Sequence, residues 1–554
     1  MEMTDRLFFI LAMLITASCA YHRNDAATPF EFRNLCTYAF LYVLCRILFS
    51  PGKTRKVCEQ IIVLSISCLC LYESYLCVEQ ITGHRFSNNQ RFICTGTFSN
   101  PGPLAGLLAV GSTLALSWII LYGKENSGNS FIASLTSRTA LLSAFTGTVL
   151  IPATGSRSAL CSLAAGLLAV LAKKRPAGLE RLITGHRYLF FTASVLLLML
   201  STVCMYNVKK ESAEGRLFMN RITIMAIAES PLTGTGPGSF THSYGNAQYR
   251  YFTGGNYTEK ERMTADCPEF AFNTFLCTGL EYGVPSMILL ISAIICSIVN
   301  STRNASPFGE SLLALAVFSL FSYPHEIAVF RLLMPVFAAS GASSARMPRN
   351  TATAAAILSS TLFLWCIPGM AVTAETEKKW KALQTLYRQQ DYSSVVKSYP
   401  ELLPEMKHNY RFLFQFGHSL REERQYARSD TILKMGESLS GDPMFWNLIG
   451  RNAQDMGNSA EAERCYSKAF SMIPNRLYPL YLLAVLYHET GNAEKFSDMI
   501  EQIDGFKPKV ESEVTRTLRK ELYALDSIPV SDCRHFKHFP NKPEMAYDCN
   551  GNNL

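Results

Sequence analysis

The sequence predicts an all-α protein in which a bundle of membrane-spanning helices precedes a soluble array of paired helices. Up to about Met370 the chain returns repeatedly to apolar runs of the length that crosses a bilayer. From Glu375 onward it is charged and amphipathic, without any such run. The C-terminal part also carries a repeated helix–turn–helix pattern. We therefore expect a helix bundle over 1–370, repeats over 371–525 and a tail over 526–554.

The overall composition is an average over these two different parts of the chain. Hydrophobic residues make up 48% of the 554 residues and charged residues 17%. The net charge of +8 is scattered over short connections rather than gathered on one helix or face, so we expect no nucleic-acid partner. Most of the 17 cysteines lie within apolar runs, where a free thiol behaves as a small hydrophobe. The cysteines therefore indicate no obvious chemistry.

Apolar segments that can span a membrane recur about eleven times before the charged part of the chain. They lie at roughly 6–20, 34–50, 59–79, 103–122, 138–153, 157–172, 187–206, 275–300, 309–322, 325–340 and 353–370. Several are shorter than the usual ~20 residues. A pair of them near 138–172 or 309–340 would alternatively form re-entrant or tilted hairpins.

Lysines and arginines in the short connections orient the bundle, because they favour the cytoplasmic side. Three clusters fall on one side when the spans alternate: Lys53, Arg55 and Lys56, then Lys173, Lys174, Arg175 and Arg181, then Arg346 and Arg349. If that side is the cytoplasm, the N-terminus is cytoplasmic. The segments 81–102 and 207–274 and the repeats then share the extracytoplasmic side.

The extreme N-terminus allows a competing interpretation. The segment from Leu7 to Ala20 contains Ile15-Thr16-Ala17-Ser18-Cys19 and is compatible with a signal peptide that ends at a lipidated cysteine. The acidic residues Glu2 and Asp5 beside the single Arg6 argue against a signal peptide. The apolar spans that follow directly also favour a first membrane span.

A 34-residue repeat is recognisable between Pro443 and Arg476. The residues at its characteristic positions are Trp446, Gly450, Gly457, Ala462, Tyr466, Ala469 and Pro474. Gly457 recurs as Gly491 one period later, and a looser copy precedes it around 412–441. We therefore expect tetratricopeptide-like repeats whose concave face docks a peptide or protein partner, the alternative being a stabilising cap.

The tail carries two cysteines with two histidines nearby. Cys533 and Cys549 with His535 and His538 suit either a metal site or a disulfide. Two thiols in an oxidising compartment more often pair with each other, so we favour the disulfide.

The connection 207–274 concentrates unusual polar residues. At about seventy residues it far exceeds the usual length of a connection, which favours a functional role. Its glycine-rich stretch, Gly234-Thr235-Gly236-Pro237-Gly238, lacks a following lysine and a preceding strand. A tight turn is therefore favoured over a nucleotide-binding loop.

Two shorter motifs lie at the same edge of the predicted bundle, at 95–101 and 154–159. The second contains Arg157. An arginine at the membrane edge is costly unless it is paired with an anion or exposed to water, so Arg157 is a functional candidate. The alternative is an interfacial anchor whose charged end reaches the water.

Four segments in this order resemble the superfamily of O-antigen ligases, O-antigen polymerases and O-oligosaccharyltransferases. They are GTFSNPGPLAG at 96–106, TGSRSALCSLAAGLL at 154–168, GRLFMNRITIMAIAESPLTGTGPGSF at 215–240 and FNTFLCTGLEYGVPSMILL at 272–290. A further SYP stands at 322–324. The resemblance covers about 90–340, and several members of the superfamily also carry C-terminal tetratricopeptide repeats.

The resemblance implies a membrane glycosyltransferase in the bacterial inner membrane. Such an enzyme moves a glycan from an undecaprenyl diphosphate carrier to an acceptor hydroxyl on lipid A core, a growing glycan or a protein, at the periplasmic face. It implies no cofactor, nucleotide sugar or metal. Arg157, Arg216 and Arg221 match the family's phosphate-binding arginines, and guanidinium groups suit a diphosphate.

The sequence departs from the family at one important place. Many members have a histidine immediately before the asparagine that corresponds to Asn273, and some have a second one two residues earlier. Here these positions are Phe272 and Phe270, so that histidine is excluded as the base. Glu269 and Glu281 are then the leading candidates, Glu281 being equally suited to a structural pairing with an arginine. Asp266, His242 and His325 are further candidates.

Two functions without glycan transfer remain open at the level of the sequence. A non-catalytic scaffold would use the bundle to anchor the repeats and would explain the missing histidine. A transporter is less favoured, because no span shows a paired proton-relay pattern and the polar residues gather in one outer loop.

Overall fold

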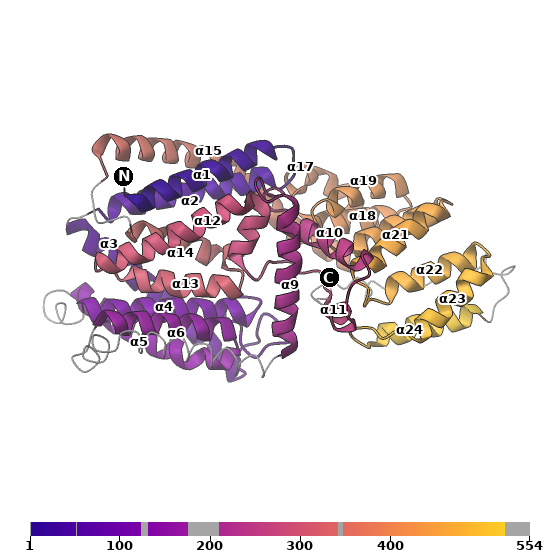
Figure 1. Cartoon of the computed structure of the whole chain (residues 1–554), viewed down its shortest axis with the longest axis horizontal. Coiled ribbons are helices and arrows are strands. Elements are labelled where there is room, and N and C mark those ends of the chain that lie inside the picture. The colour runs from indigo at the N-terminus through magenta and orange to yellow at the C-terminus, as the bar shows by residue number, and fades with distance from the viewer. Residues whose placement is uncertain (1, 51–52, 123–130, 175–209, 342–346, 527–554) are drawn as a thin grey trace. The chain divides into compact units, whose positions relative to one another are not determined.

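A computed structural model describes residues 2–50, 53–122, 131–174, 210–341 and 347–526 of the chain, and these ranges contain helices but no strand (Figure 1). The chain divides into two compact units. The bundle unit comprises Met1–Ala17, Phe32–Ala213 and Ala271–Cys366. The C-terminal unit comprises Ser18–Glu31, Glu214–Phe270 and Ile367–Leu554. Each unit is described by itself.

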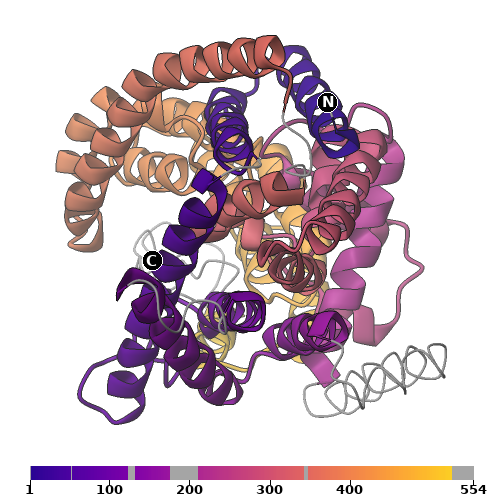
Figure 2. The same ribbon diagram turned by 90° about the vertical axis from the view of Figure 1, so that its left-hand side faces the viewer.

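The bundle unit is built from long apolar helices, and Figure 2 shows several of the central ones nearly along their axes. Its helices are α1 (Met3–Tyr21), α2 (Thr28–Leu48), α3 (Lys53–Ile81), α4 (Pro101–Tyr122), α5 (Phe131–Leu150), α6 (Arg157–Lys174), α12 (Thr274–Arg303), α13 (Phe308–Phe321), α14 (Ala328–Gly341) and the first part of α15 (Arg349–Arg388).

Helix α4 forms the centre of this unit and contacts α3, α5, α6 and α13. Small residues make these contacts close. A Cβ atom at Gly106 would lie 2.3 Å from the Phe318 ring, and one at Gly111 would lie 2.3 Å from the Cys70 sulfur. Glycine at such crossings lets apolar helices approach closely, as is usual inside membranes.

Five helices of the described residues are long and apolar enough to cross a membrane: Met3–Tyr21, Arg55–Ile81, Pro101–Tyr122, Thr274–Arg303 and Arg349–Arg388. Helices α13 and α14 are apolar but shorter. Large apolar side chains are exposed on the bundle unit, including Phe145 at 66% and Trp365 at 70% exposure. Such exposed apolar surface is typical of contact with lipid.

The predicted spans each coincide with a helix, except 187–206, which lies outside the described residues. How many of these helices cross the bilayer stays a prediction. Two contacts show which ends of the helices lie together. Arg55 Nη2 donates to the Asn304 carbonyl at 3.1 Å, and Lys173 Nζ donates to the Ser306 carbonyl at 2.8 Å. The start of α3, the end of α6 and the α12–α13 connection therefore meet at one end of the bundle, as the charge pattern requires.

The first helix is tied into the bundle by a buried ion pair. Arg46 Nε lies 3.1 Å from Asp5 Oδ1, and both side chains are almost completely buried. Tyr42 also donates to Asp5 at 3.1 Å. A buried charge without its partner is costly, so this contact favours a first helix that is retained in the protein rather than cleaved as a signal peptide.

The C-terminal unit contains three consecutive helix pairs. They are α18 (Tyr410–Glu422) with α19 (Tyr426–Glu437), α20 (Met444–Asp455) with α21 (Ser459–Met472), and α22 (Tyr478–Glu489) with α23 (Ala493–Asp504), followed by α24 (Glu513–Asp526). The first helices of the pairs begin 34 residues apart, at the predicted period. Gly457 and Gly491 form the turns within two pairs with φ of 81° and 71°. That these pairs belong to the tetratricopeptide class stays a prediction.

The segment predicted as a long loop of the bundle, 207–274, is mostly helical. It forms α9 (Lys210–Glu229), α10 (Phe240–Thr253) and α11 (Glu259–Thr264), and most of it groups with the C-terminal helices. The unit boundary after Cys366 lies close to the predicted boundary at 370. Two short helices, α16 (Tyr392–Ser398) and α17 (Leu403–Met406), precede the pairs. The predicted tail disulfide of Cys533 and Cys549, with His535 and His538, lies outside the described residues.

Candidate functional site

Arg157 is the first residue of α6, directly after a tight turn. Helix α5 ends at Leu150, a 3₁₀ turn covers Pro152–Thr154, and Gly155 follows in the left-handed conformation with φ of 63°. The Ser156 N–H donates to Thr154 Oγ1 at 3.2 Å. The turn thus places a half-buried guanidinium at the N-terminus of a helix. Both the helix dipole and the arginine favour an anion there.

The neighbouring motif at 95–101 has a structural role that the sequence did not reveal. Gln80 Oε1 accepts hydrogen bonds from the backbone N–H groups of Thr95 at 2.8 Å and Gly96 at 2.9 Å. Glu73 Oε2 accepts one from the Thr97 N–H at 3.0 Å. Two polar side chains of α3 therefore fix this loop against the bundle.

Asn273 is the N-cap of α12. Its side-chain oxygen accepts hydrogen bonds from the N–H groups of Phe275 at 3.0 Å and Leu276 at 3.1 Å, which satisfies two otherwise unpaired donors of the helix start. Phe272, in the position of the family's histidine, packs edge-on against Tyr323 with ring centroids 5.1 Å apart. This start of α12 is therefore capped and held by aromatic packing.

His325 lies beside this helix start, although the sequence placed it among the lesser candidates. It belongs to the short turn Pro324–Glu326 between α13 and α14. Its Nδ1 lies 2.9 Å from Thr274 Oγ1, and its Nε2 lies 3.5 Å from Glu326 Oε1. Arg331 pairs with Glu326 at 2.8 Å and also donates to the His325 carbonyl. The structure thus brings an imidazole to the residue that follows Asn273.

Glu281 lies two residues before a break in α12. Gly283 has φ of 85° and ψ of 160°, outside the helical range, and Pro285 follows it. Ser286 Oγ donates to the Tyr282 carbonyl at 2.9 Å, which partly replaces the lost helix hydrogen bonds. Non-helical backbone at membrane depth is tolerated where it is buried in protein or lines a polar cavity. Glu281 is half-buried beside that backbone.

Glu269, the other leading candidate for the base, is held by an arginine of the C-terminal unit. Its Oε1 lies 2.5 Å from Arg411 Nη2. The Glu269 carboxylate is therefore occupied by the guanidinium. Glu269 can act as a base only after this pair opens.

The remaining candidates for the base are engaged in contacts within the same unit. Asp266 pairs with Lys509 at 2.8 Å and with Arg476 at 3.4 Å. His242 contacts the Glu437 carbonyl through Nδ1 at 2.8 Å and Asn246 through Nε2, also at 2.8 Å. Both ring nitrogens of His242 are therefore occupied.

Arg216 and Arg221 lie on α9 in the C-terminal unit, whereas Arg157 belongs to the bundle unit. Arg221 Nη1 lies 2.6 Å from Glu261 Oε1, and its guanidinium stands over the Tyr251 ring at 5.2 Å. The pKa of Glu261 is lowered, chiefly by its hydrogen bond from the backbone of Thr258. Arg221 is therefore paired with a carboxylate. Arg216 is a half-buried arginine one and a half turns before it.

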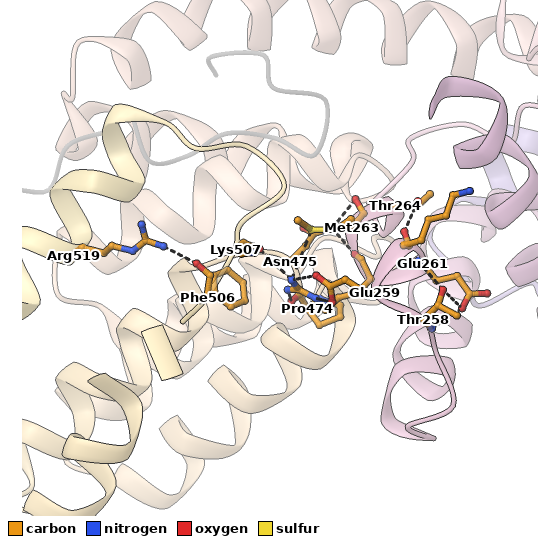
Figure 3. Close-up of polar contacts among 12 residues, drawn as sticks. Thr258, Glu259, Glu261, Met263, Thr264, Pro474, Asn475, Phe506, Lys507 and Arg519 are labelled. Carbon is orange, nitrogen blue, oxygen red and sulfur yellow. Dashed lines mark hydrogen bonds and ion pairs between the residues drawn. The ribbon is translucent and has the colours of Figure 1, made fainter. Parts of the chain in front are cut away.

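The segment around α11 is fixed to the C-terminal helices by polar contacts that the sequence did not predict (Figure 3). The Asn475 side chain donates to the carbonyls of Arg262 and Ala265, both at 2.8 Å. In return, Arg262 donates to the Pro474 carbonyl at 2.8 Å and the Lys507 carbonyl at 3.1 Å. The predicted repeat array thus binds a part of its own chain.

Helix α10 docks on the same helices. Gln248 donates to the Met472 carbonyl at 2.8 Å, and Thr241 donates to the Leu439 carbonyl at 2.6 Å. A Cβ atom at Gly245 would lie 2.5 Å from the Cα of Gly441, so glycine is needed for this approach. In the described ranges no group of three or more His, Cys, Asp or Glu side chains is arranged to hold a metal ion.

The comparison with known families gives a match over part of the chain. Residues 142–291 match the family model described as O-Antigen ligase. Together with the apolar helices, this match supports a membrane protein of the O-antigen ligase superfamily, whose members are of a glycosyltransferase type. The matched range contains Arg157, Arg216, Arg221, Glu269 and Glu281. A search of curated proteins gives no match.

Proposed function

We propose that this protein transfers a glycan from an undecaprenyl diphosphate carrier to an acceptor hydroxyl at the periplasmic face of the bacterial inner membrane. The acceptor is a lipid A core, a growing glycan or a protein. The observation that carries the proposal is the position of Arg157, at the N-terminus of α6 and within the range that matches the O-antigen ligase family. The N-terminus of the chain is cytoplasmic in this proposal.

Glycan transfer from a diphosphate carrier requires an anion-binding site. The leaving group is a diphosphate, and negative charge grows on its bridging oxygen as the bond to the sugar breaks. Fixed positive charge and N–H donors aimed at that oxygen stabilise the transition state. Arg157 supplies the charge and the first turn of α6 supplies the donors. Apolar helices of the bundle offer a surface to the polyprenyl chain.

A second arginine is expected to share the diphosphate. Arg216 and Arg221 are the candidates, and binding through Arg221 requires that its ion pair with Glu261 opens first. Glu281 serves either as a proton acceptor beside the broken part of α12 or as a buried partner of a cation. Glu269 serves as a proton acceptor only when Arg411 releases it.

The C-terminal helices have two roles in this proposal. They hold α10 and α11, as the contacts of Asn475 and Gln248 indicate. Their remaining surface recruits a protein partner or the acceptor, as helical repeats commonly do.

Glycans in a deletion strain test the proposal. We expect undecaprenyl-linked glycan to accumulate, and we expect the wild-type gene but not Arg157→Ala to restore its transfer. Arg85→Ala is a matched control, because Arg85 is an exposed arginine in another loop predicted on the same side. Full rescue by Arg157→Ala would remove this arginine from the mechanism. Uncapped lipid core, single repeat units or unglycosylated proteins would each identify a different acceptor.

A non-catalytic scaffold is the second candidate function. One observation favours it: the position of the family's histidine is filled by Phe272, whose ring packs against Tyr323. A scaffold would support normal glycan assembly when the C-terminal unit is attached to an unrelated membrane anchor, whereas an enzyme would not.

A further inference from the structure

We propose that His325 is the general base that accepts the proton of the acceptor hydroxyl. This inference rests on the proposed glycan transfer and names a residue that the family match, which ends at residue 291, does not include. The evidence is the placement of His325 between a hydroxyl and a carboxylate at the start of α12.

The contact with Thr274 orients the ring. The Nδ1 atom lies 2.9 Å from Thr274 Oγ1, and Nε2 is buried without a hydrogen-bond partner. In the proposed mechanism the proton is on Nδ1, which donates to the threonine, and Nε2 carries the lone pair that accepts the proton. A hydrogen bond at one ring nitrogen commonly determines the chemistry of the other.

The carboxylate of Glu326 stabilises the protonated ring. It lies 3.5 Å from Nε2, and Arg331 holds its other oxygen at 2.8 Å. Once Nε2 has taken up a proton, the imidazolium gains an attractive neighbour that the neutral ring lacks. Threonine, histidine and glutamate thus form a chain in which each group orients the next.

The reaction balances with this single base. The acceptor O–H gives its proton to Nε2 while its oxygen forms a bond to the anomeric carbon of the glycan. The bond from that carbon to the diphosphate oxygen breaks, and its electron pair leaves on the diphosphate. The imidazolium then returns the proton to water.

The acceptor has to reach Nε2, which is covered. The His325 side chain is 21% exposed, and Glu326, which is 34% exposed, is the carboxylate beside it. Of the other side chains considered as bases, Glu269 is paired with Arg411, Asp266 is paired with Lys509, and His242 is engaged at both ring nitrogens. Glu281 lies beside the break in α12.

The proposal is tested with membranes of a deletion strain as the source of donor and acceptor, to which purified full-length protein is added. The measured quantity is the rate at which undecaprenyl diphosphate is released. His325→Asn retains a donor for Thr274 but has no basic nitrogen. We expect its rate to fall by about 100-fold or more, the usual contribution of a general base. His84→Ala, a histidine in an exposed loop, is the matched control and is expected to keep the wild-type rate.

Chemical rescue distinguishes a base from a structural residue. Imidazole added to His325→Ala is expected to restore at least a tenfold increase in rate, because it supplies the missing base. A wild-type rate in His325→Asn, or a loss in His325→Ala that imidazole does not restore, would overturn the role of His325. Absence of release by the wild-type protein would instead refute the proposed function itself.

Discussion

Asn475 is expected to hold the segment around α11 against the C-terminal helices. Its side chain is 3% exposed and donates to two backbone carbonyls at 2.8 Å each. Alanine at this position removes both hydrogen bonds, together with a longer one to the Met263 carbonyl at 3.4 Å, and leaves the buried Ala265 carbonyl without this donor. Each lost hydrogen bond costs about 0.5–1.5 kcal/mol, and an unsatisfied buried group costs about 1–3 kcal/mol. We therefore expect Asn475→Ala to destabilise the docked segment by about 2–4 kcal/mol.

Hydrogen exchange of the full chain in detergent measures this effect. A cost of about 2–4 kcal/mol raises the exchange of amides in α11 by roughly 30- to 1,000-fold, if α11 exchanges by local undocking. Asn256→Ala is the matched control, because Asn256 is exposed in the connection just before α11. Unchanged protection of α11 in Asn475→Ala would refute the idea that this side chain secures the segment.

Three further predictions follow from single contacts. Gly96→Ala places a Cβ atom 2.1 Å from the Glu73 carboxylate at a φ of 58°, so its abundance in membranes is expected to fall severalfold. If His325 is the base, Glu269→Gln breaks only the charge pairing with Arg411, so the rate of glycan transfer is expected to stay within about threefold of wild type. Burial lowers the pKa of His418 to about 3. The unfolded chain therefore takes up a proton that the folded chain does not, and stability falls by about 2 kcal/mol between pH 7 and pH 5.

Each of these predictions has a control or an outcome that would contradict it. Gly83 has a similar φ of 78°, and no atom lies within 4 Å of a Cβ added there. The abundance of Gly83→Ala therefore measures the cost of the backbone conformation alone, without the collision that occurs at Gly96. A 100-fold lower rate of glycan transfer in Glu269→Gln would indicate that Glu269 is the base. Thermal unfolding of His418→Asn between pH 5 and pH 7 is expected to lose this part of the pH dependence. A slope equal to that of the wild type would refute the contribution of His418.

Patterns along the sequence predicted the elements well. Apolar runs long enough to cross a bilayer predicted the long helices. A helix inside a membrane contacts lipid or other helices along its whole length, so its residues are apolar throughout. Alternating basic connections predicted which helix ends meet, as the contacts of Arg55 and Lys173 show. The spacing of Gly457 and Gly491 predicted the turns of the helix pairs, since both positions require positive φ.

Contacts between distant segments could not be predicted from the sequence. Asn475 and Gln248 bind backbone carbonyls, and any residue supplies a carbonyl, so these contacts leave no pattern at the partner. The same holds for Gln80 and Glu73, which fix the loop at 95–97 through its N–H groups. His325 stood fifty-one residues from its partner Thr274, and nothing in either segment marked the pair.

The most direct test of glycan transfer is a reconstitution of the purified protein with undecaprenyl diphosphate-linked glycan and acceptor from a deletion strain. The account predicts that the wild type releases undecaprenyl diphosphate as glycan appears on the acceptor, and that Arg157→Ala slows both together by about 100-fold, as loss of one charge-stabilising donor does. Transfer by Arg157→Ala at the wild-type rate would contradict the account.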